Sequence, residues 1–171
     1  QLRDQLNDSQ WDGNVELNLP INARQVSLAD LDTIDELNQF DVIFIGALGT
    51  HNGLASIAAN LRDWVEMGGG LIASAPIIDQ VGQNYGTPLS DIDAIVPVNT
   101  TVGSSNQLSY MDLTITDGTH PITQGVGNFY VESIERATPD AGATVLATYS
   151  GYSAVVVGNP GFGRSVYLAP F

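Results

Sequence analysis

The residues best placed to do chemistry lie around the stretch GGGLIASAP, residues 68–76. This pattern predicts a tight turn that leads into a buried strand ending in small residues. In many α/β enzymes, the carboxyl end of such a strand carries a nucleophile or a metal ligand, and the residues available there are Ala73, Ser74 and Ala75. Only Ser74 has a reactive atom, so the question is whether other side chains activate it.

Two loops are expected to reach the same edge of the sheet as Ser74. One is ALGTHNG, which follows the apolar run FDVIFIG, and the other is SAPIIDQ, which follows the next strand. Ligands of open α/β sheets bind beyond the carboxyl ends of the strands. The sequence therefore predicts a small polar binding pocket at this edge, formed by Thr50, His51, Asn52, Ser74 and Asp79.

A serine hydrolase site would require a base and an acid beside Ser74. The available bases are His51 and His120, and the nearest acids in these loops and turns are Asp79 and Asp117. However, IASAP is not the glycine-flanked elbow that exposes a nucleophilic serine, and GYSAVVVG around Ser153 also departs from it. The pattern favours a small serine packed under a loop, so no catalytic residue is assigned.

No metal or cofactor site is expected. The two histidines lie far apart and lack HExxH spacing, and the acidic strings DLDTID and SDID lack the calcium-loop glycine and terminal glutamate. His120 precedes Pro121, so we expect it to bond backbone groups in a turn. Arg164 begins an apolar strand in a chain with few cations, and we expect it to pair with a carboxylate.

The composition restricts the partners of this chain. Its 171 residues include 19 acidic and only 5 basic side chains, which gives a formal net charge of −14. Such a surface repels nucleic acid and anionic membranes, and no apolar run of about 18 residues is present to span a bilayer. Cysteine is absent, which excludes disulfides and thiolate chemistry. These features leave the cellular location unassigned, and an extracellular location stays open.

Hydrophobic periodicity indicates the elements that would position the site. FDVIFIG is a continuous apolar run, typical of a strand covered on both faces. Apolar residues then recur at helical spacing from Leu54 to Val65, before the glycines at 68–70 and the strand LIASAP. This order predicts a strand–helix–strand unit with parallel strands. GNPGFG, between the last two apolar runs, predicts a hairpin loop rather than a phosphate loop.

The second half of the chain is rich in short apolar runs separated by glycine, proline, asparagine and aspartate. We therefore expect one α/β domain over residues 1–171, belonging to a longer protein. The expected fold is a flavodoxin-like three-layer domain with a mainly parallel central sheet and some antiparallel strands in the C-terminal half.

The strings FDVIFIG, LRDWVEMGGGLIASAP, DGTHPITQGV, AGATVLATY and GFGRSVYLAPF, in this order, resemble the class I glutamine amidotransferase-like superfamily. The likeness covers residues 40–171 and is greatest to the ThuA-like (trehalose-utilisation-like) branch, with related domains in some β-galactosidases. In catalytic relatives the strand after the helix ends in a cysteine, and in ThuA-like proteins a histidine often stands there. Aligning on GGGLI places Ala75 at that position, and the downstream His-Glu pair is not recognisable.

The resemblance thus implies the fold but not the activity. We expect a non-catalytic amidotransferase-like module for binding or assembly within a larger, secreted or carbohydrate-related protein. Its partners would be other domains of the same protein, a second copy of the chain, or a glycan. The alternative is a ThuA-like hydrolase or sugar-processing enzyme that uses His51 with Asp79 and Ser74.

Overall fold

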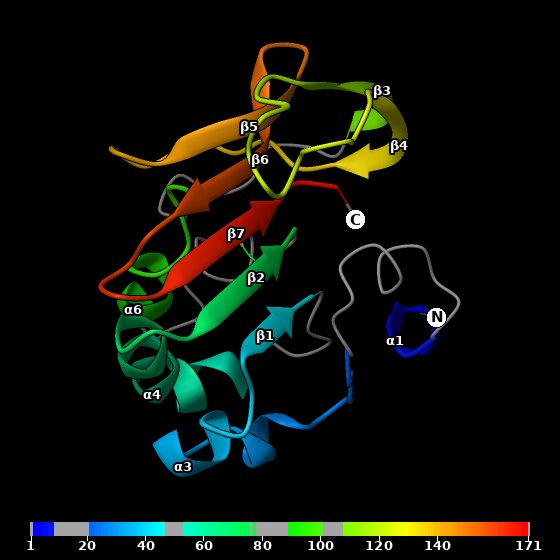
Figure 1. The fold of residues 1–171 in the computed structure, drawn as a ribbon. Coiled ribbons are helices and arrows are strands. Elements are labelled where there is room, and N and C mark those ends of the chain that lie inside the picture. Colours follow the sequence, from blue (N-terminus) through cyan, green and yellow to red (C-terminus); the bar gives the residue numbers. More distant parts are fainter. Residues whose placement is uncertain are drawn as a thin grey trace.

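The computed structural model describes residues 2–8, 21–46, 53–75, 77, 89–100 and 108–170 (Figure 1). The helices in these residues are α1 (Leu2–Leu6), the 3₁₀ helix η1 (Leu28–Asp30), α3 (Ile34–Leu37), α4 (Leu54–Glu66) and α6 (Ser90–Asp93). The strands are β1 (Val42–Ile45), β2 (Gly70–Ser74), β3 (Leu108–Ile115), β4 (Phe129–Ile134), β5 (Thr144–Tyr149), β6 (Tyr152–Gly158) and β7 (Arg164–Leu168).

The strands form a single seven-stranded sheet in the order β1-β2-β7-β6-β5-β3-β4. The β1–β2 and β2–β7 pairs are parallel, and the other four pairs are antiparallel. The sheet curls into a half-barrel, and only α4 is longer than five residues among the described helices (Figure 1). The expected flavodoxin-like three-layer domain with a mainly parallel sheet is therefore wrong.

Tight turns explain why antiparallel pairing dominates. β5 and β6 are joined by Ser150 and Gly151, whose φ angles are 44° and 84°. Positive φ at both central residues is the geometry of a two-residue hairpin turn, and such a turn can join only antiparallel strands. A parallel connection needs a crossover of about a dozen residues, and within the described sheet this occurs between β1 and β2, through α4. The predicted strand–helix–strand unit is confirmed.

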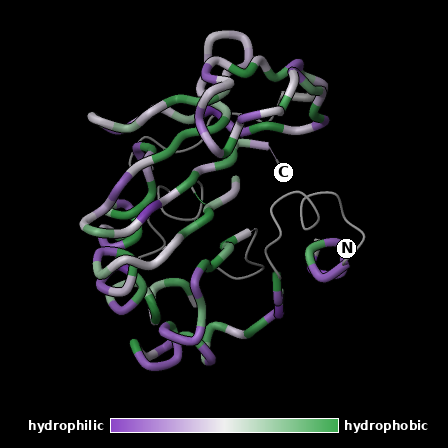
Figure 2. The backbone as a smooth tube through the Cα atoms, in the orientation of Figure 1, coloured by the Kyte–Doolittle hydropathy of each residue, from purple (hydrophilic) through white to green (hydrophobic). Residues whose placement is uncertain are grey.

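The long helix α4 buries one face against the sheet. Its buried residues are Leu54, Ile57, Ala58, Leu61, Trp64 and Val65, and they join one core with residues of the central strands. α3, α6 and η1 pack around α4, on the same side of the parallel strands (Figure 1). An ion pair from Arg62 to Asp91 also connects α4 to α6. In Figure 2, hydrophobic residues follow α4 and the central strands, whereas many outer turns are hydrophilic.

The opposite side of the parallel strands is left partly uncovered. Alternate residues of β1 point there, and the exposed fractions of Val42 and Phe44 are 52% and 47%. The strand registers place half-buried apolar residues of the neighbouring strands on the same side. We call this surface the open face; it consists of Val42, Phe44, Ile72, Val157 and Val166.

The GNPGFG loop forms the predicted hairpin between β6 and β7. It packs against the C-terminus of α4, where the Phe162 N–H donates to the Glu66 carbonyl at 2.8 Å. A Cβ atom added to Gly163 would lie 2.0 Å from the Val65 carbonyl oxygen, so only glycine fits there. This loop therefore satisfies a helix-end carbonyl, which the sequence analysis did not foresee.

Candidate functional site

Ser74 and Ala75 lie at the carboxyl end of β2, between the ends of β1 and β7. Ser74 is 7% exposed, and its hydroxyl donates to the Ala75 carbonyl at 3.1 Å. Ala75 is fully buried, and its N–H donates to the Leu168 carbonyl at 2.9 Å. The hydroxyl proton of Ser74 thus points to the backbone, which is not the arrangement of a serine nucleophile bonded to a base.

The other residues of the predicted pocket, Thr50, His51, Asn52 and Asp79, lie outside the described residues. The pocket itself and the alternative that His51 acts with Asp79 and Ser74 therefore stay predictions. The described part of this edge contributes Ser74 at the end of β2, Ala75 just after it, Gly46 after β1, and the end of β7.

A buried carboxylate that sequence reasoning missed lies at the same edge. Glu135 follows β4 and is 3% exposed, and its N–H donates to the Ala169 carbonyl at 3.0 Å, just beyond β7. The Tyr167 hydroxyl donates to Glu135 Oε2 at 2.9 Å, and the Tyr149 hydroxyl donates to the Glu135 carbonyl at 3.1 Å. Both tyrosines are almost completely buried. Two tyrosines from neighbouring parts of the sheet thus hold this acidic residue across the end of β7.

Burial changes the acidity of this cluster. Burial raises the pKa of Tyr149 to about 12, and the positive charge of Arg136 partly opposes this rise. The centroid of the Tyr149 ring lies 5.6 Å from that of the Tyr152 ring. The Arg136 guanidinium carbon lies 4.5 Å from the Tyr152 ring centroid, while its Nε is buried without a hydrogen-bond partner in the described part of the chain. Tyr149 therefore stays protonated near neutral pH and serves as a hydrogen-bond donor.

A local signal for this cluster does exist in the sequence. Glu135 sits in the string SIERA, where buried Ile134 and Ala137 flank the charged pair. A carboxylate within an apolar pattern indicates a partner in the fold, because an unpaired buried charge is costly. The partner, Tyr167, lies 32 residues away, so only the tertiary structure identifies it.

His120 bonds backbone groups, as predicted. Its Nδ1 accepts a hydrogen bond from the Ile122 N–H at 3.2 Å, and its carbonyl accepts from the Thr123 N–H at 2.9 Å. Hydrogen bonds from Thr119 lower the pKa of Asp117 in the same turn. Arg164 is exposed and forms no ion pair with a described carboxylate, so its predicted ion pair is not confirmed.

The described residues contain neither a cluster of metal-ligating side chains nor a helix that could span a membrane. No three side chains of His, Asp or Glu within them gather in a way that could hold a metal ion. No helix in these same ranges has both the length and the apolar character needed to cross a bilayer.

No protein-family model matches the chain, and no curated protein matches it. Solved structures do share its fold. Two cytoplasmic proteins from Salmonella typhimurium align with TM-scores of 0.68 and 0.65 at 19% and 21% identity. Each alignment covers 81% of this chain but only 63% and 64% of those proteins, so the chain spans less than two thirds of their length.

A protein from Bacteroides uniformis described as ThuA-like aligns over 98% of this chain and 76% of its own, with a TM-score of 0.61 and 12% identity. The fold is similar to that of a ThuA-like protein. A β-galactosidase from Bacillus circulans sp. alkalophilus matches 78% of this chain with 20% of its own, at a TM-score of 0.55 and 14% identity. At such identities, the likeness concerns the fold alone.

Proposed function

We propose that this chain is a non-catalytic amidotransferase-like module that packs against another protein surface through its open face. The observation that carries the proposal is the exposure of Val42 and Phe44, at 52% and 47%, on the partly uncovered side of the parallel strands. Parallel strands are normally buried on both faces, because apolar side chains point to both sides. Four of the described helices, α3, α4, α6 and η1, pack together on the other side (Figure 1).

The state of the β2 strand end supports a role other than catalysis. Buried Ala75 has no reactive atom, and the Ser74 hydroxyl already donates to a backbone carbonyl. Glu135, the buried acid of this edge, accepts a hydrogen bond from the Tyr167 hydroxyl and lies across the end of β7. The contacts of Glu135 hold the segment after β4 against the end of β7. Among the described residues, no nucleophilic side chain lies beside a base.

The comparison with β-galactosidases supports the same proposal. A fold similar to this chain makes up about 20% of a β-galactosidase chain, so it occurs as one part of a larger enzyme. A part of that kind contributes contacts to its neighbours, and exposed apolar surface is the physical feature that such contacts require. We therefore expect the occupant of the open face to be protein, either a second copy or another domain.

Sedimentation velocity of the purified chain tests this proposal for a second copy. The wild-type chain should sediment as an oligomer, at an ionic strength high enough to screen its net charge of −14. Phe44→Ser should shift it to a monomer, because the substitution removes apolar contact area from the open face. The matched control is Phe129→Ser on β4, whose side chain is 43% exposed at the other end of the sheet and should leave the oligomer intact.

If the chain sediments as a monomer, a photo-crosslinking amino acid at position 44 tests for another domain of the natural protein. A defined crosslink from position 44, absent from position 129, supports the proposal. A monomer with no such crosslink contradicts it. Turnover of a substrate that is lost in His51→Ala would instead favour the alternative enzyme.

A further inference from the structure

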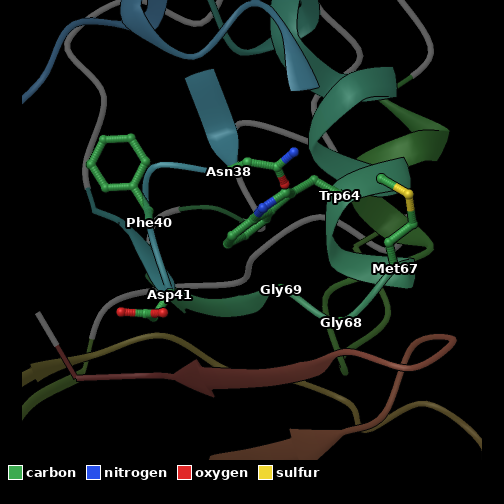
Figure 3. A pocket seen from close by; sticks show the side chains of 7 residues that line it. All are labelled: Asn38, Phe40, Asp41, Trp64, Met67, Gly68 and Gly69. Atoms are coloured by element: carbon green, nitrogen blue, oxygen red, sulfur yellow. The ribbon is translucent and has the colours of Figure 1, made fainter. Parts of the chain in front are cut away.

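A depression lies at the amino edge of β1 and β2, opposite the edge where sequence analysis placed the pocket. Its volume is about 410 Å³, and it is shallow and open to solvent. Two loops form it, one before β1 and one between α4 and β2 (Figure 3). The lining residues are Asn38, Phe40, Asp41, Trp64, Met67, Gly68 and Gly69.

Trp64 has an unusual position in this depression. The residue is only 4% exposed, and its ring packs so closely under Gly69 that an added Cβ there would lie 2.5 Å from it. Its indole N–H makes no hydrogen bond to a described residue. The same nitrogen is not sealed in the core, since Arg136 Nε is the one fully buried side-chain nitrogen without a partner in the described chain. The indole nitrogen therefore keeps some contact with solvent, and Trp64 is one of the residues that line the depression.

Two more polar side chains of the depression have no protein partner among the described residues. Asn38 and Asp41 are both exposed, and neither side chain forms a hydrogen bond or ion pair with described residues. Figure 3 shows the Asn38 amide on the side of the indole nitrogen, with the Asp41 carboxylate farther along the wall. Met67 adds an apolar wall, with 61% of its surface exposed.

The carbonyls at the end of α4 do not compete for a ligand here. The carbonyls of Asp63, Trp64 and Val65 accept backbone N–H groups of residues 67–69, and that of Glu66 accepts from Phe162. Among side chains, the polar groups left to a ligand are one donor on Trp64, one acceptor carboxylate on Asp41, and the amide of Asn38, which both donates and accepts.

This set of groups selects hydroxyl-bearing ligands. An ammonium group would suit Asp41 but cannot accept from Trp64, whereas an anion would accept from Trp64 but be repelled by Asp41 and by the net charge of −14. A hydroxyl group both donates and accepts. A ring of hydroxyls would serve all three side chains, and its C–H face would pack on Met67.

We propose that this depression, centred on the Trp64 indole N–H with Asn38 and Asp41, is a binding site for a monosaccharide unit. The proposal does not rest on the proposed docking role, since it uses the amino edge of the strands rather than the open face. The site is shallow and its three polar contacts are few, so we expect a dissociation constant of about 1–10 mM for a single sugar.

Titration of the ¹⁵N-labelled chain with methyl β-glucoside, methyl β-galactoside and methyl α-mannoside tests the proposal. The chain has two tryptophans, so its spectrum contains two indole N–H signals, and Trp64→Phe identifies the one from Trp64. With at least one of these sugars, the Trp64 signal should shift saturably. Asp41→Asn and Asn38→Ala should each weaken binding about tenfold.

The matched control is Asp112→Asn, which removes another exposed carboxylate, on β3, and should leave the affinity unchanged. If Trp64→Phe fails to fold, Trp11→Phe assigns the two indole signals instead. Asn38 and Asp41 are exposed, so their variants keep the test valid. An unmoved Trp64 signal at about 100 mM of every sugar overturns the proposal. So does unchanged affinity in Asp41→Asn and Asn38→Ala, or a Trp64 shift with choline but with no sugar.

Discussion

At the scale of single residues, the carboxyl edge of the parallel strands is occupied by groups that already have partners. The Ser74 hydroxyl bonds a carbonyl, and the Glu135 carboxylate accepts from Tyr167. Buried polar groups of this kind stabilise a fold when they are satisfied and destabilise it when a partner is removed. The hydroxyl of Tyr167 is therefore a direct test of whether this cluster carries stability.

Replacing Tyr167 with Phe should lower the free energy of unfolding by about 1.5–3 kcal/mol. The change keeps the ring in the core but removes a donor from a buried carboxylate. Urea unfolding followed by circular dichroism measures the effect. Tyr152→Phe is the control, since its hydroxyl makes no hydrogen bond to a described residue, and it should change stability by less than about 0.5 kcal/mol. Equal effects of the two variants would contradict the assignment.

Tyr149 should make the fold sensitive to alkaline pH. Burial raises its pKa from 10.0 to about 12, so the folded state keeps the proton up to a pH at which the unfolded state has lost it. The stabilisation is complete below pH 10 and is lost as pH rises towards 12, with a decrease of up to about 1.4 kcal/mol per pH unit. Unfolding free energies at pH 9, 10 and 11 should show this decline, and the slope should be smaller in Tyr149→Phe. Identical slopes in both proteins would contradict the prediction.

At the scale of elements, local patterns identified helices and strands better than they identified their assembly. The helix α4 and the strands around it follow from periodicity, because one face of the helix must be apolar to be buried. The turn at Ser150 and Gly151 follows the serine–glycine signal of a tight hairpin. The contact of the GNPGFG loop with the end of α4 was not predictable, since it joins segments about 100 residues apart in the chain.

The close packing of the GNPGFG loop on α4 predicts that a methyl group added at Gly163 destabilises the fold. Gly163→Ala should lower the free energy of unfolding by at least about 2 kcal/mol, because its Cβ would lie 2.0 Å from the Val65 carbonyl oxygen and backbone would have to move. Gly118→Ala is the matched control, because its Cβ would meet nothing within 4 Å and should change stability by less than about 1 kcal/mol. Thermal and urea unfolding of both variants measure the difference. A Gly163→Ala protein as stable as the control would contradict the packing described here.

At the scale of the whole molecule, two surface properties dominate: a large negative charge and an apolar open face. The net charge of −14 destabilises the folded state, because folding brings the carboxylates closer together and increases their mutual repulsion. Exposed Val42 and Phe44, in contrast, favour contact with other apolar surfaces. The two act against each other in self-association. We therefore expect salt to affect both stability and assembly.

Raising NaCl from about 0.01 M to about 0.5 M at pH 7 should increase the free energy of unfolding by about 1 kcal/mol. Over this range the Debye length falls from about 30 Å to less than about 8 Å, which screens repulsion among the exposed carboxylates. The same titration near pH 4.1, where the sequence has no net charge, is the control and should show little effect. An equal salt effect at both pH values would mean that screening of net charge is not the cause.

The sequence by itself determined what depends on local order: the parallel β1–α4–β2 unit, the hairpin at GNPGFG, and the backbone role of His120. The tertiary structure alone decided the curled, mostly antiparallel sheet, the Glu135–Tyr167 pair and the depression around Trp64. The physical reason is distance along the chain. Periodicity and turn chemistry act over a few neighbouring residues, whereas strand pairing and buried polar contacts join segments that only the complete fold brings together.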